Sequence, residues 1–278
     1  MTDEAVNSVC EARLLTHGEK TERVVILLHG FTNCPQMWVK FGEELFATGS
    51  NVLIPRLPRH GLADRLTRSL AHLTGDELRT CVEDAAQEAS ELGRKVTVAG
   101  LSLGAVLAAH LAIKSDLVDR SVMIAPLFAA PGMPIPVSDA LGFAAEHLLP
   151  NLFIWWDREK KADIVGPPYA YPRFATRGYA AMLQLGDQVR RAAKDRPPKV
   201  RDLRVVMNAA DPAVNNQATE DLVRTWRGHG SEVQVHVFPK EMGLLHDLID
   251  PTQLQQRTDV VYPVLRDWMT RDENVPLN

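Results

Sequence analysis

The strongest chemical signal in the sequence is the segment Gly100–Gly104, which reads G-L-S-L-G. It directly follows the apolar run 95–99 and precedes a run with helical spacing, which is the context of a G-x-S-x-G nucleophile elbow. A serine hydroxyl becomes a good nucleophile only when a neighbour takes its proton, and a sharp strand-to-helix turn projects it toward such a base. The five-residue pattern also arises by chance, so its position between strand and helix is what predicts Ser102 as a catalytic nucleophile.

A second signal, His29-Gly30-Phe31, ends the apolar run 24–28 and begins a loop. Acyl transfer passes through a tetrahedral intermediate, whose negatively charged oxygen needs N–H donors. We expect one donor to be the N–H of Leu103, the residue after the nucleophile, and the other to be the N–H of Phe31. His29 is interpreted as a brace for this loop rather than as the catalytic base.

An acid and a base follow two strand-like runs late in the chain. Asp211 comes after the run 203–207, where sites in open α/β sheets form, and Pro212 restricts it to an extended backbone. The structural alternative for Asp211 is an ordinary Asp-Pro turn. His246 follows the last strand-like run, so its imidazole is predicted to take the hydroxyl proton of Ser102 and return it to the leaving group.

Other histidines and carboxylates have structural explanations. His236 alternates within a strand pattern, and His229 ends a helix beside glycines. Asp247 and Asp250 are interpreted as a solvated turn and a helix cap. The nine histidines lack the paired spacing of a zinc site, and no glycine-rich phosphate loop occurs, so we expect neither a metal nor a cofactor.

Three segments and two later residues together make the sequence resemble the α/β-hydrolase superfamily, and more narrowly its bacterial carboxylesterase and monoacylglycerol-lipase-like branch. The residues that carry the resemblance are His29-Gly30-Phe31-Thr32, Leu57-Pro58-Arg59-His60-Gly61, Gly100–Gly104, Asp211 and His246. The resemblance implies the chain order serine, acid, histidine, and it implies a structural role for His60 in the floor of the site. The sequence departs from the family at Arg59, where glycine is usual, so the resemblance says less about the shape of that loop.

Short aliphatic and β-branched runs alternate with longer runs whose apolar residues recur every three or four positions. The strand-like runs are 24–28, 52–54, 96–99, 122–125, 203–207 and 233–238. The helical runs are 37–47, 76–92, 104–114 and 219–227. Strands that are apolar on consecutive residues are typical of sheets covered on both faces. The pattern predicts an α/β fold with a mostly parallel, twisted sheet and helices on both faces.

The interval 127–198 breaks this alternation, because it holds many prolines and no clear strand. An insertion of this size in an α/β series is more often a functional cap than a structureless loop. We therefore predict an α/β-hydrolase core from 1–126 and 199–278 with an inserted cap or lid from 127–198. The aromatic residues of the cap more often form its core, but they are also candidates to line an apolar substrate pocket. They are Phe153, Trp155, Trp156, Tyr169, Tyr171 and Phe174.

The composition is that of an ordinary globular protein. The 278 residues are 45% hydrophobic and 24% charged, and the net charge is −4. This balance excludes a disordered chain, and the lack of a long basic run argues against a nucleic-acid partner. Prolines interrupt the charge-free run 121–138, so we expect no transmembrane helix and no integral membrane association.

The three cysteines are too few and too scattered for a disulfide framework. They are Cys10, Cys34 and Cys81, and Cys34 is interpreted as a bystander in the loop after Phe31. The first residues also lack the positive flank and apolar stretch of a signal peptide. We therefore expect three reduced cysteines in a cytoplasmic protein.

These residues together predict a serine hydrolase whose partner is a small-molecule ester. The expected substrates are carboxylic esters with short to medium acyl groups, or monoacylglycerol-like esters, cleaved through an acyl-enzyme on Ser102. Thioesterases, peptidases, carbon–carbon hydrolases and acyltransferases of this fold use the same three residues and stay open, as does a ligand receptor with slow turnover. The oligomeric state also stays open.

Overall fold

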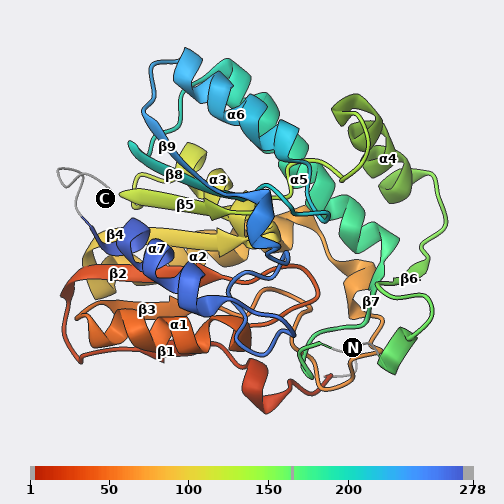
Figure 1. The fold of residues 1–278 in the computed structure, drawn as a ribbon, viewed down its shortest axis with the longest axis horizontal. Helices are drawn as coiled ribbons and strands as arrows, with labels where there is room; N and C mark the ends of the chain where they lie inside the picture. The colour runs from red at the N-terminus through yellow and green to blue at the C-terminus, as the bar shows by residue number, and fades with distance from the viewer. Residues whose placement is uncertain (1–3, 164–165, 272–278) are drawn as a thin grey trace.

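A seven-stranded sheet forms the centre of the molecule in the computed structural model, which describes residues 4–163 and 166–271. The strand order is β1-β3-β2-β4-β5-β8-β9 (Figure 1). The strands are β1 (Arg13–Leu15), β2 (Thr21–Leu28), β3 (Asn51–Ile54), β4 (Gly93–Leu101), β5 (Arg120–Ile124), β8 (Asp202–Asn208) and β9 (Val233–Phe238). β1 runs antiparallel to β3, and the other neighbouring pairs are parallel.

The predicted fold class is confirmed, and each of the six predicted strands corresponds to one of β2, β3, β4, β5, β8 and β9. β1 was not predicted. It has three residues, of which Arg13 and Leu14 are exposed, so it carries neither an apolar run nor a clear alternation. Its pairing with β3 covers one edge of the parallel sheet.

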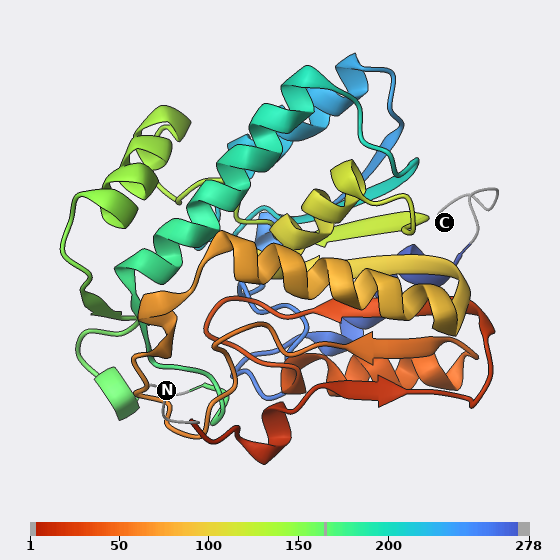
Figure 2. The ribbon, with the colours of Figure 1, turned by 180° about the vertical axis from the view of Figure 1, so that it is seen from behind.

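Helices cover both faces of the sheet, as Figures 1 and 2 show from opposite sides. The helices of one face are α1 (Gln36–Ala47) and α7 (Thr258–Thr270), and those of the other are α2 (Gly75–Leu92), α3 (Leu103–Lys114), α5 (Thr176–Asp195) and α6 (Asn216–Gly228). Successive side chains of β2 enter opposite layers, because Val25 packs with α1 and α7 whereas Val24 and Ile26 pack on the other side. Burial on both faces explains why these strands are apolar at consecutive positions.

The chain between β5 and β8 forms a helix, a small ribbon and a second helix. These elements are α4 (Ile135–His147), β6 (Phe153–Trp155), the 3-10 helix η3 (Lys161–Asp163), β7 (Arg173–Ala175) and α5. α5 belongs to the main core, where Met182 and Leu185 pack with residues of the sheet. α4 by contrast buries only Ser138 and Gly142, and Figure 2 shows it standing away from the sheet. The insertion therefore shares the core of the sheet, and its description as a separate cap from 127–198 stays a prediction.

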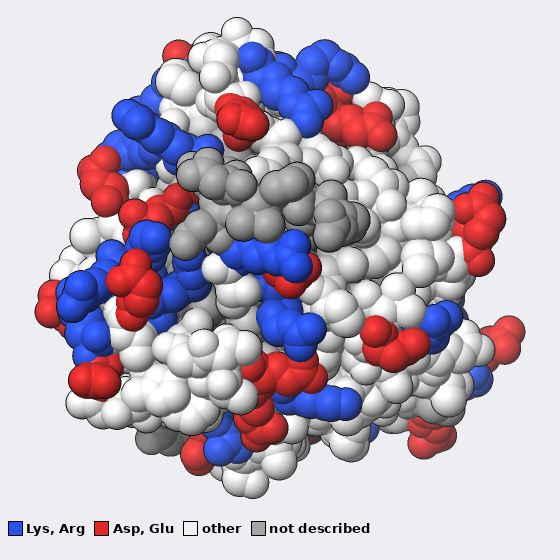
Figure 3. Space-filling view, turned by 60° about the vertical axis from the view of Figure 1, so that its left-hand side comes forward, with Lys and Arg blue, Asp and Glu red and all other residues white. Residues whose placement is uncertain are grey.

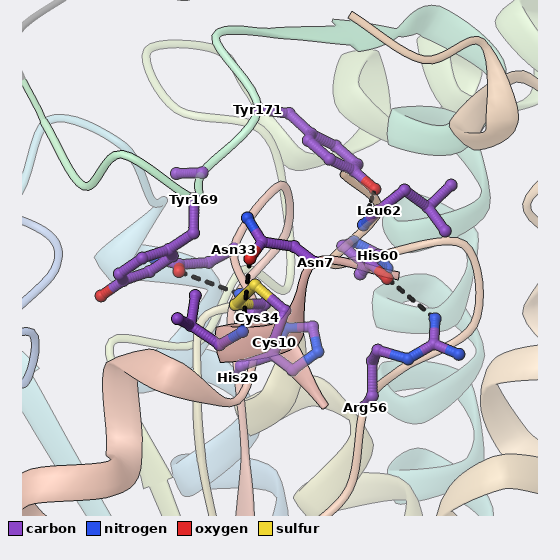
Figure 4. Close-up of a disulfide and its surroundings, with 12 residues drawn as sticks. Asn7, Cys10, His29, Asn33, Cys34, Arg56, His60, Leu62, Tyr169 and Tyr171 are labelled. Atoms are coloured by element: carbon purple, nitrogen blue, oxygen red, sulfur yellow. Dashed lines mark hydrogen bonds between the residues drawn. A yellow bond between two sulfur atoms is a disulfide. The ribbon is translucent and has the colours of Figure 1, made fainter. Parts of the chain in front are cut away.

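Cys10 and Cys34 form a disulfide, so the prediction of three reduced cysteines was wrong. Their Cα atoms are 5.4 Å apart, although 24 residues separate them in the chain. The antiparallel pairing of β1 returns the N-terminal segment to the loop after β2, and no spacing in the sequence reveals that contact. Figure 4 shows the disulfide beside Tyr169, with which both cysteines share a buried cluster. Cys34 is thus a tether of its loop, and Cys81 is the free cysteine.

The surface agrees with the modest net charge of −4. On the face drawn in Figure 3, lysine and arginine side chains alternate with aspartate and glutamate. Within residues 4–163 and 166–271, no helix has the length and hydrophobicity needed to cross a membrane.

Removing the disulfide should lower the free energy of unfolding. The cross-link closes a loop of 24 residues, and the loss of that constraint in the unfolded chain costs about 3 kcal/mol. We expect the double variant Cys10→Ser/Cys34→Ser to unfold at a lower denaturant concentration than the wild type, as measured by fluorescence in urea. Cys81→Ser is the matched control, and equal midpoints for the two variants would contradict the prediction.

Candidate active site

Ser102 lies at the turn between β4 and α3, with φ of 56° and ψ of −110°. Residues other than glycine rarely adopt a positive φ. The turn is held by the Ser102 N–H, which donates to Ile124 O at 3.0 Å. A Cβ at Gly100 would lie 2.1 Å from Gly104 O, and one at Gly104 would lie 2.2 Å from Leu28 O. Glycine is therefore required at both positions by the close approach of α3 to β4 and β2.

Asp211 and His246 meet at the carboxyl ends of β8 and β9. His246 Nδ1 donates to Asp211 Oδ2 at 2.7 Å, and the Asp211 side chain is fully buried. Because a carboxylate only accepts hydrogen bonds, Nδ1 carries the hydrogen and Nε2 is left as the basic nitrogen. Asp211 is held in its turn by a bond from its N–H to Asn208 O at 3.2 Å and by the Ala213 N–H, which donates to Oδ1 at 2.8 Å.

Ser102 and His246 line one cavity of about 560 Å³, together with Gly30 and Phe31. Among the described residues, no hydrogen bond joins the Ser102 hydroxyl to the His246 ring. Such contacts are often long before substrate binds and tighten in the complex. The structure thus brings the candidate nucleophile and base to one cavity and joins the base to the acid.

Two residues of the insertion hold the loop that carries Phe31. Thr32, the next residue, has a positive φ of 62°. Its hydroxyl donates to Phe31 O at 2.7 Å and accepts from Trp156 Nε1 at 3.1 Å, and its carbonyl accepts the Tyr171 N–H at 2.8 Å. Leu103 is the first residue of α3, and the first N–H groups of a helix have no acceptor within it. Both candidate oxyanion donors therefore come from backbone that neighbouring elements position.

His29 and His60 have the geometry of braces. His29 Nδ1 donates to Gly30 O at 2.9 Å and Nε2 accepts the Leu57 N–H at 3.0 Å, whereas His60 Nδ1 donates to Pro58 O at 2.8 Å. Burial, with the charge of His60, holds the pKa of His29 well below its usual value. Burial also lowers the pKa of His60 to about 4, against the opposing effect of the Pro58 bond. Neither ring lines the cavity, so the interpretation of both as structural fits their surroundings.

Trp156 and Tyr171 are the two predicted aromatic residues that line the cavity. Phe174 lies behind them, with its ring centroid 4.4 Å from that of Trp156 and 6.0 Å from that of Phe31. It supports the wall without forming it.

The other three aromatic candidates lie away from the cavity lining. The Trp155 and Phe153 rings face the Arg173 guanidinium, at 5.5 and 4.6 Å from their centroids. The Tyr169 hydroxyl donates to Asp250 Oδ2 at 2.7 Å, and its ring packs on the disulfide. The strand alternation of the β6–β7 ribbon, which sends neighbouring side chains to opposite faces, was not evident in the sequence.

The interpretation of Asp250 as a helix cap was wrong. Asp250 is fully buried, and its Oδ1 accepts the Thr252 N–H at 2.9 Å in a turn, well before α7 begins. Asp247 lines the cavity and accepts a hydrogen bond from Gln253 Nε2 at 2.5 Å. The segment after His246 folds against Tyr169, a contact between distant segments that local patterns do not indicate.

Several cavity residues were missed in the sequence. They are Asn33, Arg65, Leu127, Tyr179, Met182 and Gln253. Tyr179 and Met182 lie on α5, whose apolar residues recur with helical spacing and could have located the helix, but not its position over the site.

Asn208, at the end of β8, joins the turn that carries Asp211 to the loop that carries His246. Its Oδ1 accepts the Ala210 N–H at 3.0 Å, and its Nδ2 donates to Leu244 O at 2.9 Å. The side chain and its bond to Leu244 O are buried, so loss of the amide would leave a buried carbonyl unpaired. One amide therefore positions the backbone on both sides of the Asp211–His246 pair.

His246 has a pKa above its usual value. Burial lowers it, but the hydrogen bond and negative charge of Asp211 outweigh burial, with a further contribution from the charge of Asp247. A histidine acts as a base only when it is neutral, so these carboxylates move the loss of base function toward higher pH.

No set of three or more His, Cys, Asp or Glu side chains in the described part of the chain is arranged to hold a metal ion. The free Cys81 is half-buried, and burial raises the pKa of its thiol to about 11. A protonated thiol is a poor ligand and a poor nucleophile, so Cys81 adds no second reactive centre.

A family model described as the Alpha/beta hydrolase family matches residues 25–250. This range includes Phe31, Ser102, Asp211 and His246. No curated protein matches the chain in sequence.

Solved structures with the same fold include lipolytic enzymes. A structure reported for LipS and LipT, two metagenome-derived lipolytic enzymes, has a TM-score of 0.73 at 16% identity and covers 95% of this chain and 98% of the other. A monoacylglycerol lipase of Paleococcus ferrophilus has a TM-score of 0.70 at 16% identity, over 93% and 98%. A soluble variant of the monoglyceride lipase of Saccharomyces cerevisiae, in complex with a substrate analogue, has a TM-score of 0.71 at 12% identity, over 93% and 90%. Similarity at these identities shows the shared fold.

Asp247→Asn should shift the acidic limb of the pH profile of kcat/KM to lower pH. The substitution removes a negative charge that raises the pKa of His246, so the base stays neutral to a more acidic pH. The profile is measured with a chromogenic ester from pH 5 to 9. Glu241→Gln is the control, because Glu241 is an exposed carboxylate in the same segment after β9. An acidic limb that stays in place or moves to higher pH in Asp247→Asn would contradict the effect of Asp247 on His246.

Asn208→Ala should lower kcat roughly ten- to hundredfold with a smaller effect on KM, because the reacting groups lose their alignment. Asn51→Ala is the matched control. Asn51 is also fully buried and bonded to backbone groups, but it lies at the opposite end of the sheet, so its loss should reduce stability without this drop in kcat. Equal kcat losses in the two folded variants would show that Asn208 has no special role.

Proposed function

The chain belongs to the alpha/beta hydrolase family, and we propose that it is a serine hydrolase that cleaves carboxylic esters through an acyl-enzyme on Ser102. The observation that carries this proposal is the 2.7 Å bond between His246 Nδ1 and Asp211 Oδ2, in a molecule where His246 and Ser102 line the same cavity. The strained elbow that holds Ser102 supports it independently, because strain of this kind is found at functional sites.

In the proposed reaction, His246 Nε2 takes the proton of the Ser102 hydroxyl as Oγ attacks the ester carbonyl carbon. Asp211 keeps the hydrogen on Nδ1 and stabilises the imidazolium that forms. The N–H groups of Phe31 and Leu103 donate to the oxyanion. His246 then protonates the leaving alcohol, and a water molecule activated by the same histidine releases the acyl group from Ser102.

The cavity supports a small, largely apolar substrate. Its volume of about 560 Å³ is within the range of small-molecule sites, and Phe31, Leu127 and Met182 offer an apolar wall. Trp156 and Tyr171 are proposed as substrate contacts from the insertion. We therefore propose short to medium acyl esters or monoacylglycerol-like esters as substrates.

A cytoplasmic location stays a prediction, and the disulfide is the observation that speaks against it. Reducing compartments keep most thiols unpaired, whereas disulfides persist in oxidising ones. Thiol titration of protein isolated under alkylating conditions would decide whether Cys10 and Cys34 are paired where the protein is made.

A fluorophosphonate probe should label the wild-type protein at Ser102, and Ser102→Ala should lower the hydrolysis of p-nitrophenyl esters by roughly a thousandfold or more. Ser115→Ala, at the other end of α3, is the matched control and should keep both properties. A panel of acyl chains from two to twelve carbons then measures the depth of the pocket. Ordinary ester turnover by Ser102→Ala would refute the proposal, whereas tight binding without turnover in the wild type would favour a receptor.

A further inference from the structure

The wall of the cavity divides into two chemically different parts. The apolar part is formed by Phe31, Leu127, Tyr179 and Met182. Its members lie together, because the Phe31 and Tyr179 ring centroids are 6.3 Å apart and both Tyr179 and Met182 belong to α5. The polar part is formed by Asn33, Arg65, Asp247 and Gln253. A substrate that fills the cavity therefore meets both hydrocarbon and hydrogen-bonding groups.

Arg65 is the cation of the polar part, and its position is set by the insertion. Its Nε donates to Ala170 O at 2.8 Å, which anchors one edge of the planar guanidinium. The side chain is half-buried, and within the described residues Arg65 belongs to no ion pair. Arg59, Arg190 and Arg204, which are also partly or fully buried, each face a carboxylate of the protein.

A half-buried guanidinium without a protein carboxylate has lost part of its hydration and has gained no counterion. A ligand with an anionic group would supply that counterion. The guanidinium is also suited to the task, because its planar N–H groups match the two oxygens of a carboxylate or phosphate.

We propose that Arg65 is the recognition site for an anionic group, a carboxylate or a phosphate, on the ester that this site hydrolyses. The inference rests on the proposed function and narrows its substrate class to esters that carry a negative charge as well as an apolar acyl group. The apolar wall beside α5 takes the hydrocarbon, and Arg65 takes the charge.

Asp247 does not cancel the charge of Arg65. Its carboxylate accepts the bond from Gln253 and acts on the neighbouring His246, and no ion pair joins it to Arg65 among the described residues. The polar part thus has a cationic position at Arg65 and an acidic one next to the base. An anionic substrate is attracted to the first and repelled by the second, which orients it in the cavity.

Three esters with the same acyl group and a three-carbon alcohol test the proposal. They are 1-hexanoylglycerol, its analogue in which the alcohol is glycerate, and 1-hexanoylglycerol 3-phosphate. A second pair, the 4-nitrophenyl esters of hexanoic and adipic acid, places the charge on the acyl side. We expect the kcat/KM of the wild type to be at least about tenfold higher for one or more of the anionic esters than for the neutral partner. The preferred ester then shows whether the site recognises a carboxylate or a phosphate.

Arg65→Gln should reduce the ratio of kcat/KM for the preferred anionic ester to that for its neutral partner roughly ten- to hundredfold, and Arg65→Lys should restore part of it. Arg158→Gln removes an exposed arginine outside the cavity lining and should keep the ratio of the wild type. A ratio near one or below in the wild type for every pair would overturn the proposal. So would a ratio that Arg65→Gln leaves unchanged, or an equal loss on both members of a pair.

Failure of the proposed function has a different signature. In that case fluorophosphonate does not label Ser102 and none of the five esters is hydrolysed. Calorimetry of 1-hexanoylglycerol 3-phosphate and of the glycerate ester with the Ser102→Ala protein then still tests Arg65. Binding that is at least tenfold weaker in Ser102→Ala/Arg65→Gln supports the anion site, and equal binding or no binding of both compounds overturns it.

Discussion

The close approach of α3 to β2 and β4 is the constraint on which the candidate site depends. The helix begins immediately where the strand ends, with Ser102 at positive φ between them, and this leaves no room for a Cβ at Gly100 or Gly104. The parallel strands β8 and β9 end at the same edge of the sheet, so their turns carry Asp211 and His246 toward that serine. Close backbone packing at these two glycines thus sets the position of the candidate nucleophile, and residues after other strands complete the candidate site.

The insertion between β5 and β8 contacts two of the segments that form the cavity. Tyr171 and Trp156 hold Thr32 beside the candidate oxyanion donor, and Tyr169 reaches Asp250 at the end of the loop that carries His246. The Cys10–Cys34 disulfide packs against Tyr169 and ties the loop that carries Thr32 to the N-terminal segment. Movement of the insertion would therefore displace both the loop that carries Phe31 and Thr32 and the segment that follows His246.

The features that could be predicted were those that depend on a few neighbouring residues in the chain. The consecutive apolar residues of β2, β4 and β5 reflect burial on both faces, and the elbow motif reflects a local steric conflict, so both are visible in a few neighbouring residues. β1 has three residues and was missed for want of any pattern. Asp250 was misinterpreted, because its surroundings are supplied by Tyr169 from a segment far away in sequence.

The sequence by itself determined the mostly parallel α/β architecture, and it identified Ser102, Asp211 and His246 as candidates after three strands. It could do so because hydrophobic periodicity and turn chemistry are local properties. Only the tertiary structure decided which distant groups meet: the bond between Asp211 and His246, the amide of Asn208 that joins their loops, the disulfide, and Arg65 in the cavity wall. Each of these joins segments that are distant in the chain. Their contact depends on strand order and on the path of the insertion, which no single stretch of residues encodes.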